Sequence, residues 1–263
     1  MGIHVVAVLR SVPDIAEELE VNESGTDIDR EWIGLKLNEF DDHALEDAIL
    51  LKESAGGSVT ALAMDAEGVD RMLQSAIARG ADRIVKITTS ALQPFPPAIV
   101  IAAFVAEAVK RLGADLVLTG VQTPEDLAGQ LAPSLGALLG WPHLSAIAGI
   151  QARDGGLVVR QEHNGGYATS VMVSMPAVLG IQTASKPPRY VSGSKLRQAT
   201  GVKPDVLALS ASVSSPVANS PVACIEALTK PETAGGAVMW DGEAEDVADR
   251  FVGLLRDRGL LKV

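Results

Sequence analysis

The chain has 263 residues, of which 47% are apolar and 3% aromatic, and its formal net charge is −11. This apolar content can fill the core of one large or two small domains, and the scarcity of aromatic residues favours an α/β protein over an aromatic-rich sandwich. The negative charge argues against nucleic-acid and anionic-membrane surfaces, which reward clustered lysine and arginine.

Cys224 is the single cysteine, so no internal disulfide can form, and a reducing, cytoplasmic compartment is expected. The apolar run in "MGIHVVAVLRSVPD" is too short for a secretion signal and is interpreted as a first strand. The richest apolar segment, residues 98–109, is interrupted by Glu107 and is shorter than the ~20 residues of a membrane span. We therefore expect no membrane insertion.

The first half of the chain alternates strands with amphipathic helices. Continuous apolar runs such as "HVVAVL" and "DLVLTG" are typical of parallel strands that helices cover on both faces. The polar segment 14–32 contains a Ser-Gly turn signal and predicts a surface hairpin. Strands are predicted at residues 3–8, 58–63, 82–87 and 115–119, and helices at residues 41–53, 68–79 and 97–112.

After Pro142 the pattern changes to short strands separated by Asp-Gly-Gly and Asn-Gly-Gly turns, which predict an antiparallel hairpin addition to the sheet. Residues 183–222 show no sustained period, so we expect an extended arm, a linker or a partner-binding segment there. In residues 242–259, apolar side chains recur at helical spacing before a glycine cap, which predicts a C-terminal helix.

Standard catalytic and phosphate signatures are missing from the sequence. It contains no G-x-x-x-x-G-K-[ST], G-x-G-x-x-G, G-x-S-x-G or H-E-x-x-H motif. The four histidines are scattered, and none has a neighbour at metal-ligand spacing, so no metal site is predicted. Cys224 has no histidine nearby and is interpreted as a small buried or incidental residue.

Two strand-to-helix turns are candidate binding sites. In "LNEFDDHALEDAILLKE", residues 37–53, Asn38 is a good N-cap, and the acids of the following turn complement the positive helix end. The same turn follows a strand-like segment, where a doubly wound sheet exposes its ligand crevice. In residues 120–142, free N–H groups around residues 128–131 can hold a phosphate without a lysine. From position alone, both turns remain open to a purely structural interpretation.

One series of segments runs in fixed order through nearly the whole chain. It comprises "AVLRSVPD", "LNEFDDHALEDAILLKE", "LQSAIARGADRIVKI", "GADLVLTGVQ", "LGALLGWP", "VVRQEHNGGYATSVMVSMPAVLGI" and "KPPRY". The series resembles the beta subunit of electron transfer flavoprotein, whose first, second and last counterparts read V-A-V-K-x-V-P-D, N-P-F-D-x-x-A-x-E-x-A-x-x-L-K-E and N-x-P-R-Y. No single motif decides, but the order and spacing together are highly specific.

The resemblance implies an α/β fold with a mostly parallel sheet flanked by helices, of the adenine nucleotide α-hydrolase-like type. Residues 1–182 would form the nucleotide-binding domain, and residues 183–263 a recognition loop and a C-terminal arm that contacts the alpha subunit. FAD would be held mainly by the alpha subunit, while this chain would bind AMP, or a second FAD in a bifurcating protein. Electrons would pass from a flavin-dependent dehydrogenase to an acceptor such as a quinone oxidoreductase, without catalytic turnover by this chain.

Carried over residue by residue, the implied nucleotide contacts lie after the first two strands, before the first helix and in the loop from residue 122. They are Val8, Asn38, Glu39, Phe40, Asp41, Met64, Gln122, Thr123, Glu125, Asp126, Ala128, Gly129, Gln130, Leu131 and Ala132. The loop departs from the family's D-D-D-x-x-Q-T-G and D-G-D-T-A-Q-V-G-P patterns, because a third acid and a phosphate-facing hydroxyl are missing. The proline that usually follows Asn38 is replaced by Glu39.

The implied partner contacts are Arg189, Tyr190, Lys195, Leu196 and Arg197. The family's docking pattern P-R-Y-x-x-L-P-x-I is kept in its first three residues, but Gly193 and Ser194 replace the anchoring leucine and the next proline. Leu196, at the isoleucine position, either substitutes as the anchor or packs on its own subunit. We therefore expect a partner other than a straight-chain acyl-CoA dehydrogenase, such as a dehydrogenase acting on methylated amines.

The alternative function is a small adenine-nucleotide hydrolase or universal-stress-like protein on a comparable sheet. Those proteins use a Gly-rich or SGGxDS-like phosphate loop after the first strand, where this chain has "LRSVPDIAEE". A third interpretation, a stand-alone scaffold domain, leaves the long arm and the C-terminal helix unexplained.

Overall fold

The computed structural model describes residues 2–16, 19–31, 33–90, 96–213, 225–231 and 235–261. Cys224, Trp32 at the end of the predicted hairpin, and residues 214–222 of the predicted arm lie outside these ranges.

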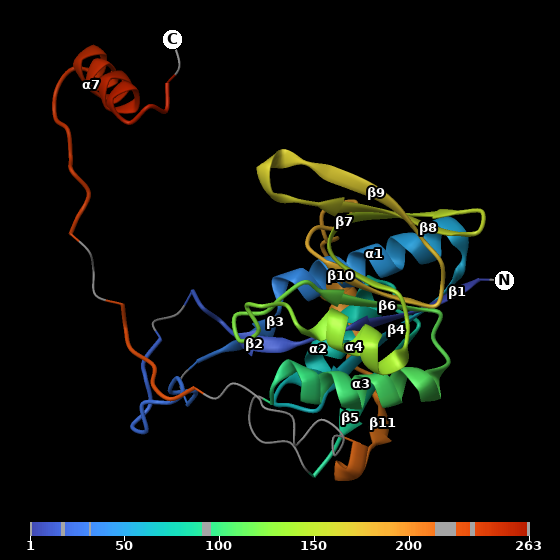
Figure 1. The fold of residues 1–263 in the computed structure, drawn as a ribbon. Coiled ribbons are helices and arrows are strands. Elements are labelled where there is room, and N and C mark those ends of the chain that lie inside the picture. The colour runs from blue at the N-terminus through green and yellow to red at the C-terminus, as the bar shows by residue number, and fades with distance from the viewer. Residues whose placement is uncertain are drawn as a thin grey trace.

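Within the described ranges, nine strands form one sheet in the order β11-β5-β4-β1-β6-β10-β7-β8-β9 (Figure 1). The parallel strands are β1 (Ile3–Val8), β4 (Gly57–Met64), β5 (Arg83–Thr88), β6 (Leu116–Gly120), β10 (Ala177–Ile181) and β11 (Asp205–Ala208), with β7 (His143–Arg153) parallel to β10. Antiparallel pairing of β7 with β8 (Gly156–Glu162), and of β8 with β9 (Ala168–Val173), forms the predicted addition. The predicted fold class is confirmed.

Helices cover both faces of the parallel strands, as the continuous apolar runs predict. The core on one face includes α1 (Glu39–Ala55) and α2 (Val69–Arg79), and the core on the other includes α3 (Ala98–Leu112) and α4 (Leu131–Leu139). Along β1, Val5 and Ala7 contact the first core, whereas Val6 and Val8 contact the second. This alternation explains why the strand is apolar at successive positions.

Two segments differ from the sequence-based prediction. Residues 183–213 are not an extended arm, because they form α5 (Gly193–Ala199), the edge strand β11 and a short 3-10 turn at Ala211–Val213. Of these elements, β11 pairs with β5 and belongs to the nine-stranded sheet. The hairpin predicted at residues 14–32 is closed by strands outside that range, β2 (Ser11–Pro13) and β3 (Leu35–Leu37), with one isolated bridge between Val21 and Ile28.

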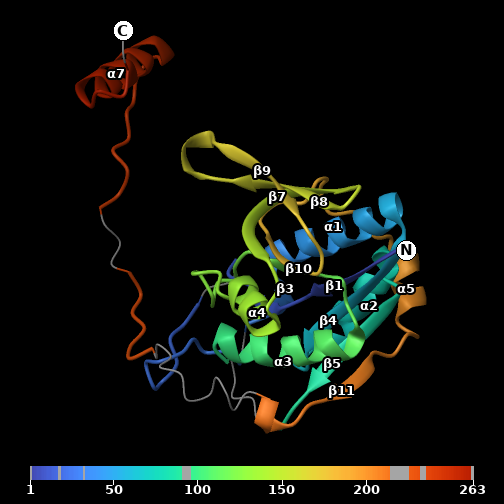
Figure 2. The ribbon, with the colours of Figure 1, turned by 45° about the vertical axis from the view of Figure 1, so that its right-hand side comes forward.

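The predicted C-terminal helix is present as α7 (Ala244–Asp257). Both ribbon views show it at the end of a long arm, away from the sheet (Figures 1 and 2). Before α7, the described segment 225–231 contacts the body at residues 20–25. Leu228 donates its N–H to the carbonyl of Gly25 at 2.7 Å, and Lys230 pairs with Glu20 at 2.6 Å. Among the helices that the structure describes, none combines the length and the apolar character needed to cross a bilayer.

A buried ion pair joins the first strand to the first helix. The side chain of Arg10 is 11% exposed and that of Asp41 is 0% exposed. One carboxylate oxygen of Asp41 accepts the main-chain N–H of Arg10 at 2.8 Å and its Nε at 2.9 Å, and the other accepts Nη2 at 2.7 Å and the N–H of Gly120 at 2.6 Å. A single carboxylate therefore ties together the carboxyl ends of β1 and β6 and the first turn of α1.

These contacts correct the interpretation of the turn before α1. Asp41 is an internal ion-pair partner, so its role is not limited to complementing the helix dipole. Asn38 occupies the N-cap position, but its side chain makes no capping hydrogen bond; its Nδ2 donates instead to the carbonyl of Gln122 at 3.0 Å. The sequence pattern missed both contacts because each partner lies far away along the chain.

Arg10→Met is expected to lower the free energy of unfolding by about 3–5 kcal/mol, because it leaves the carboxylate of Asp41 buried without its counter-charge. The matched control is Arg83→Met, which breaks the exposed pair with Asp205 and should cost about 0–1 kcal/mol. Urea titration of both variants measures the difference. Equal losses would contradict a structural role for the buried pair.

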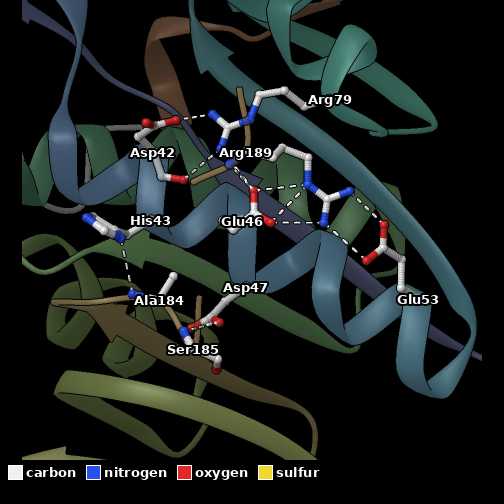
Figure 3. Close-up of polar contacts among 9 residues, drawn as sticks. All are labelled: Asp42, His43, Glu46, Asp47, Glu53, Arg79, Ala184, Ser185 and Arg189. Atoms are coloured by element: carbon white, nitrogen blue, oxygen red, sulfur yellow. Dashed lines mark hydrogen bonds and ion pairs between the residues drawn. The ribbon is translucent and has the colours of Figure 1, made fainter. Parts of the chain in front are cut away.

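Further along, the helix α1 carries more buried acids, among them Glu46 and Asp47. One carboxylate oxygen of Asp47 accepts the N–H of Ser185 at 2.8 Å, and the other has no hydrogen-bond partner among the described atoms (Figure 3). Burial raises the pKa of Asp47 from 3.8 to about 6, and the neighbouring Glu46 adds to the increase. The folded protein therefore holds this proton more tightly than the unfolded chain does.

Asp47→Asn is expected to raise the free energy of unfolding above about pH 7 by about 2–3 kcal/mol, because the ionised form is penalised only in the fold. As the pH rises from about 4 to about 6, the unfolded chain loses its proton first and wild-type stability falls, so the gain of the variant should vanish below about pH 4. Urea titrations across this range measure the difference. The exposed control Asp154→Asn should change stability by less than about 0.5 kcal/mol at every pH, and a pH-independent difference for Asp47→Asn would refute the assignment.

Candidate functional site

The candidate site lies where the strand order reverses. β1 has β4 on one side and β6 on the other, and all three run parallel. In open α/β sheets, ligands bind outside the carboxyl ends of the strands at such a switch point. The loops after Val8, Met64 and Gly120 meet at this edge, and the turn at residues 38–41 lies beside them.

The structure brings most of the sequence-predicted nucleotide contacts to this edge, but with different access. Val8 is buried against the α3 side of the core, so only its main chain is available to a ligand. Asn38 and Asp41 are buried and bonded within the protein, whereas Glu39 is exposed and Phe40 and Met64 are partly buried. At this edge, the groups left for a ligand are therefore largely main-chain groups and the loop that follows β6.

That loop, residues 121–130, is bonded internally. The N–H and the side-chain oxygen of Thr123 bond with Asp126, and the carboxylate of Asp126 accepts the N–H groups of Gln130, at 2.9 Å, and Leu131, at 3.3 Å. The N–H of Gly129 donates to the Asp126 carbonyl at 3.0 Å. Three of the N–H groups predicted to be free for a phosphate are therefore occupied, and Asp126 supplies the anion at the start of α4.

Glu125 connects this loop to the hairpin segment. Its carboxylate pairs with Arg30 at 2.9 Å, and Arg30 also pairs with Asp27 at 3.1 Å. Burial raises the pKa of Glu125, while Arg30 opposes the change. Among the other residues predicted here, the carbonyl of Gln122 accepts the Nδ2–H of Asn38. Ala128 and Gln130 are exposed, whereas Leu131 and Ala132 are buried at the start of α4.

Two further residues shape this site, Arg10 and Arg30, and neither is among the predicted nucleotide contacts. Besides its pair with Asp41, the Arg10 guanidinium donates to the carbonyls of Gly120 at 2.9 Å and Gln122 at 3.4 Å. A signal for Arg10 was present, because it occupies the lysine position of the family's first motif. No local pattern marks Arg30, whose partner Glu125 is 95 residues away.

The five predicted partner contacts fall on α5 and on the segment before it. Tyr190 is 93% exposed and Leu196 is 38% exposed, and Lys195 and Arg197 are exposed as well. Leu196 is therefore partly packed and partly available. Arg189 differs from the others, because its guanidinium pairs with Glu46 at 2.9 Å and with Glu53 at 2.6 Å.

Comparison with known proteins identifies the family. A family model described as "Electron transfer flavoprotein domain" matches residues 27–211. Electron transfer flavoprotein subunit beta of Methylophilus methylotrophus is 32% identical over 199 residues, which cover 74% of this chain and 75% of the relative. The proteins of the same name from Bacillus subtilis and Syntrophomonas wolfei are 28% and 29% identical, covering 91% and 92% of this chain and 93% and 91% of the relatives.

The family model spans the turn at residues 38–41, the loop after β6, the antiparallel addition and α5. Together with the relatives, it favours the flavoprotein interpretation over the hydrolase alternative. The chain belongs to the electron transfer flavoprotein family and, within it, to the beta subunits.

Proposed function

We propose that this chain pairs with an alpha subunit to form a cytoplasmic electron carrier and has no catalytic turnover of its own. The carrier takes electrons from a flavin-dependent dehydrogenase and passes them to an acceptor such as a quinone oxidoreductase. The redox FAD is held mainly by the alpha subunit, and this chain contributes a structural adenine nucleotide site. The observation that supports the pairing is the uncovered apolar face of α7.

The helix α7 presents an apolar face that its own chain does not cover. Val247, Phe251, Leu254 and Leu255 recur at helical spacing, none of the helix residues is buried, and Phe251 is 52% exposed. A helix with one apolar face is stable in water when that face is packed against another surface. Since the arm carries α7 away from the sheet (Figure 2), the alpha subunit is the proposed cover.

Phe251→Ser is expected to weaken the complex with the alpha subunit by about 2 kcal/mol, or roughly 30-fold in Kd, because it removes the largest side chain of the apolar face. Its matched control is Asp249→Ser on the exposed part of the same helix, which should change Kd by less than about threefold. Titration calorimetry measures both. If the two substitutions have the same effect, α7 is not the contact.

For the nucleotide, we propose AMP in the crevice at the carboxyl ends of β1, β4 and β6. Two main-chain N–H groups at the start of α4 donate to the carboxylate of Asp126, and the support for the proposal is that the same groups can donate to a phosphate. The residues thus fit a phosphate that takes the place of the Asp126 carboxylate. Main-chain groups at residues 38–41 and 8 and the side chain of Gln130 would hold the rest of the nucleotide, and a second FAD would occupy the same crevice in a bifurcating protein.

Gly129→Ala is expected to lower the nucleotide content of the purified protein. Gly129 has a φ of +63°, and an added Cβ would lie 2.4 Å from the carbonyl oxygen of Val121, so the loop must move. Gly140→Ala is the matched control, because its φ of +68° is equally left-handed but nothing lies within 4 Å of the added atom. Both pay about 1 kcal/mol for the backbone conformation, and Gly129→Ala alone should lose nucleotide on acid extraction and chromatography. Equal nucleotide contents in the two variants would show that the nucleotide does not bind beside Gly129.

For the electron donor, we propose a dehydrogenase other than the common straight-chain acyl-CoA type, and one acting on methylated amines is a candidate. The support is the chemistry of α5, where Gly193 and Ser194 replace the family's leucine and proline and Leu196 remains partly exposed. Assay of the complete heterodimer with a panel of dehydrogenases tests the proposal. Efficient reduction by a medium-chain acyl-CoA dehydrogenase, unaffected by Leu196→Ala, would overturn it.

A further inference from the structure

We propose that Arg189 and Glu46 are positioning residues that hold α5 in its docking orientation, and that Arg189 is not part of the docking surface. The inference rests on the proposed docking of a dehydrogenase at α5. It reassigns Arg189, which sequence resemblance groups with the partner contacts, to the support of the segment that carries them.

The first support is the environment of Glu46. Its buried carboxylate accepts the main-chain N–H of Arg189 at 3.0 Å and the side-chain Nε at 2.9 Å (Figure 3). Because one carboxylate holds both the backbone and the guanidinium, it fixes the direction of the chain at Arg189 as well as its place. Further along α1, the exposed carboxylate of Glu53 accepts Nη1 of Arg189 at 2.6 Å and Nη2 at 3.1 Å.

The residues before Arg189 are also hydrogen-bonded to side chains of α1. His43 Nδ1 accepts the N–H of Ala184 at 3.2 Å, and Asp47 accepts the N–H of Ser185 at 2.8 Å. The hydroxyl of Ser185 in turn accepts the N–H of Ile150 in β7 at 3.1 Å. Side chains of α1 therefore hold the chain at three points as it runs from β10 toward α5 (Figure 3).

The far end of α5 is held by α2. Gln74 Nε2 donates to the carbonyls of Thr200 and Val202, both at 3.1 Å, and Ala199 is buried. Arg79, also on α2, pairs with Asp42 and donates to Glu46 at 3.3 Å. The anchors at both ends of α5 are thereby connected through Glu46.

The residues that hold α5 in place are therefore different from the residues that α5 and its preceding segment expose to a partner. A helix of seven residues is too short to persist on its own, so the orientation of α5 depends on its two anchors. With those anchors in place, Tyr190 and Leu196 project from a fixed base, and a partner does not have to order the segment when it binds. Loss of the Arg189 anchor should weaken docking without removing any atom from the docking surface.

The test uses the complete heterodimer and two measurements, hydrogen–deuterium exchange at residues 190–200 and KM for the heterodimer as electron acceptor of its dehydrogenase. Arg189→Ala should speed exchange there roughly tenfold and raise KM roughly fivefold, with exchange in β6 unchanged. Arg189→Lys, which keeps the charge but not the fork of donors, should recover only part of both effects. Glu46→Gln, a milder change should Arg189→Ala fail to fold, is expected to act in the same direction.

Tyr190→Ser is the control for a residue of the docking surface itself, and it should leave exchange at residues 193–200 unchanged. A rise in KM for Arg189→Ala with unchanged exchange would make Arg189 a partner contact and overturn the inference, as would the absence of both effects. If the wild-type heterodimer accepts no electrons from any dehydrogenase, the proposed function fails, while the exchange measurement still decides whether Arg189 positions α5.

Discussion

The ion pair between Arg10 and Asp41 is the constraint on which the rest of the site depends. It joins β1, α1 and β6 at the point where the strand order reverses. The same guanidinium holds the carbonyls of Gly120 and Gln122, and Asn38 bonds Gln122 a second time. The path of the loop after β6 is thereby set before any ligand arrives. A buried pair of this kind contributes little net stability compared with apolar packing, but it specifies one geometry.

The helix α1 links the carboxyl ends of β1 and β6 to the segment that is proposed to dock a dehydrogenase. Its first turn supplies Asp41 to the crevice, and its later turns supply His43, Glu46 and Asp47 to the chain that leads to α5. These polar contacts explain why the helix buries several acids where amphipathic patterning would place apolar side chains. In the proposed carrier, which would hold a nucleotide and also present a partner surface, one helix would thus fix the relative placement of both.

The sequence predicts the central layers and the separate C-terminal helix well, because continuous apolar runs at β1 and β6 and amphipathic patterns in α2, α3 and α7 depend on local periodicity. It predicts β11 and α5 poorly, because elements of four and seven residues show too few turns of any period. The polar contacts are also beyond local pattern, since Arg189 lies 143 residues from Glu46. Position predicts free N–H groups for a phosphate at the start of α4, but nothing in the local sequence shows that the carboxylate of Asp126 accepts two of them.

Flavin absorbance of the purified chain, alone and after it is mixed with the alpha subunit and FAD, tests the proposed carrier function. We expect no flavin band from the isolated chain after gel filtration. With the alpha subunit, we expect an equimolar complex that carries stoichiometric FAD and accepts electrons from a flavin-dependent dehydrogenase. A chain that forms no such complex, or that turns over adenine nucleotides on its own, would contradict the proposed function.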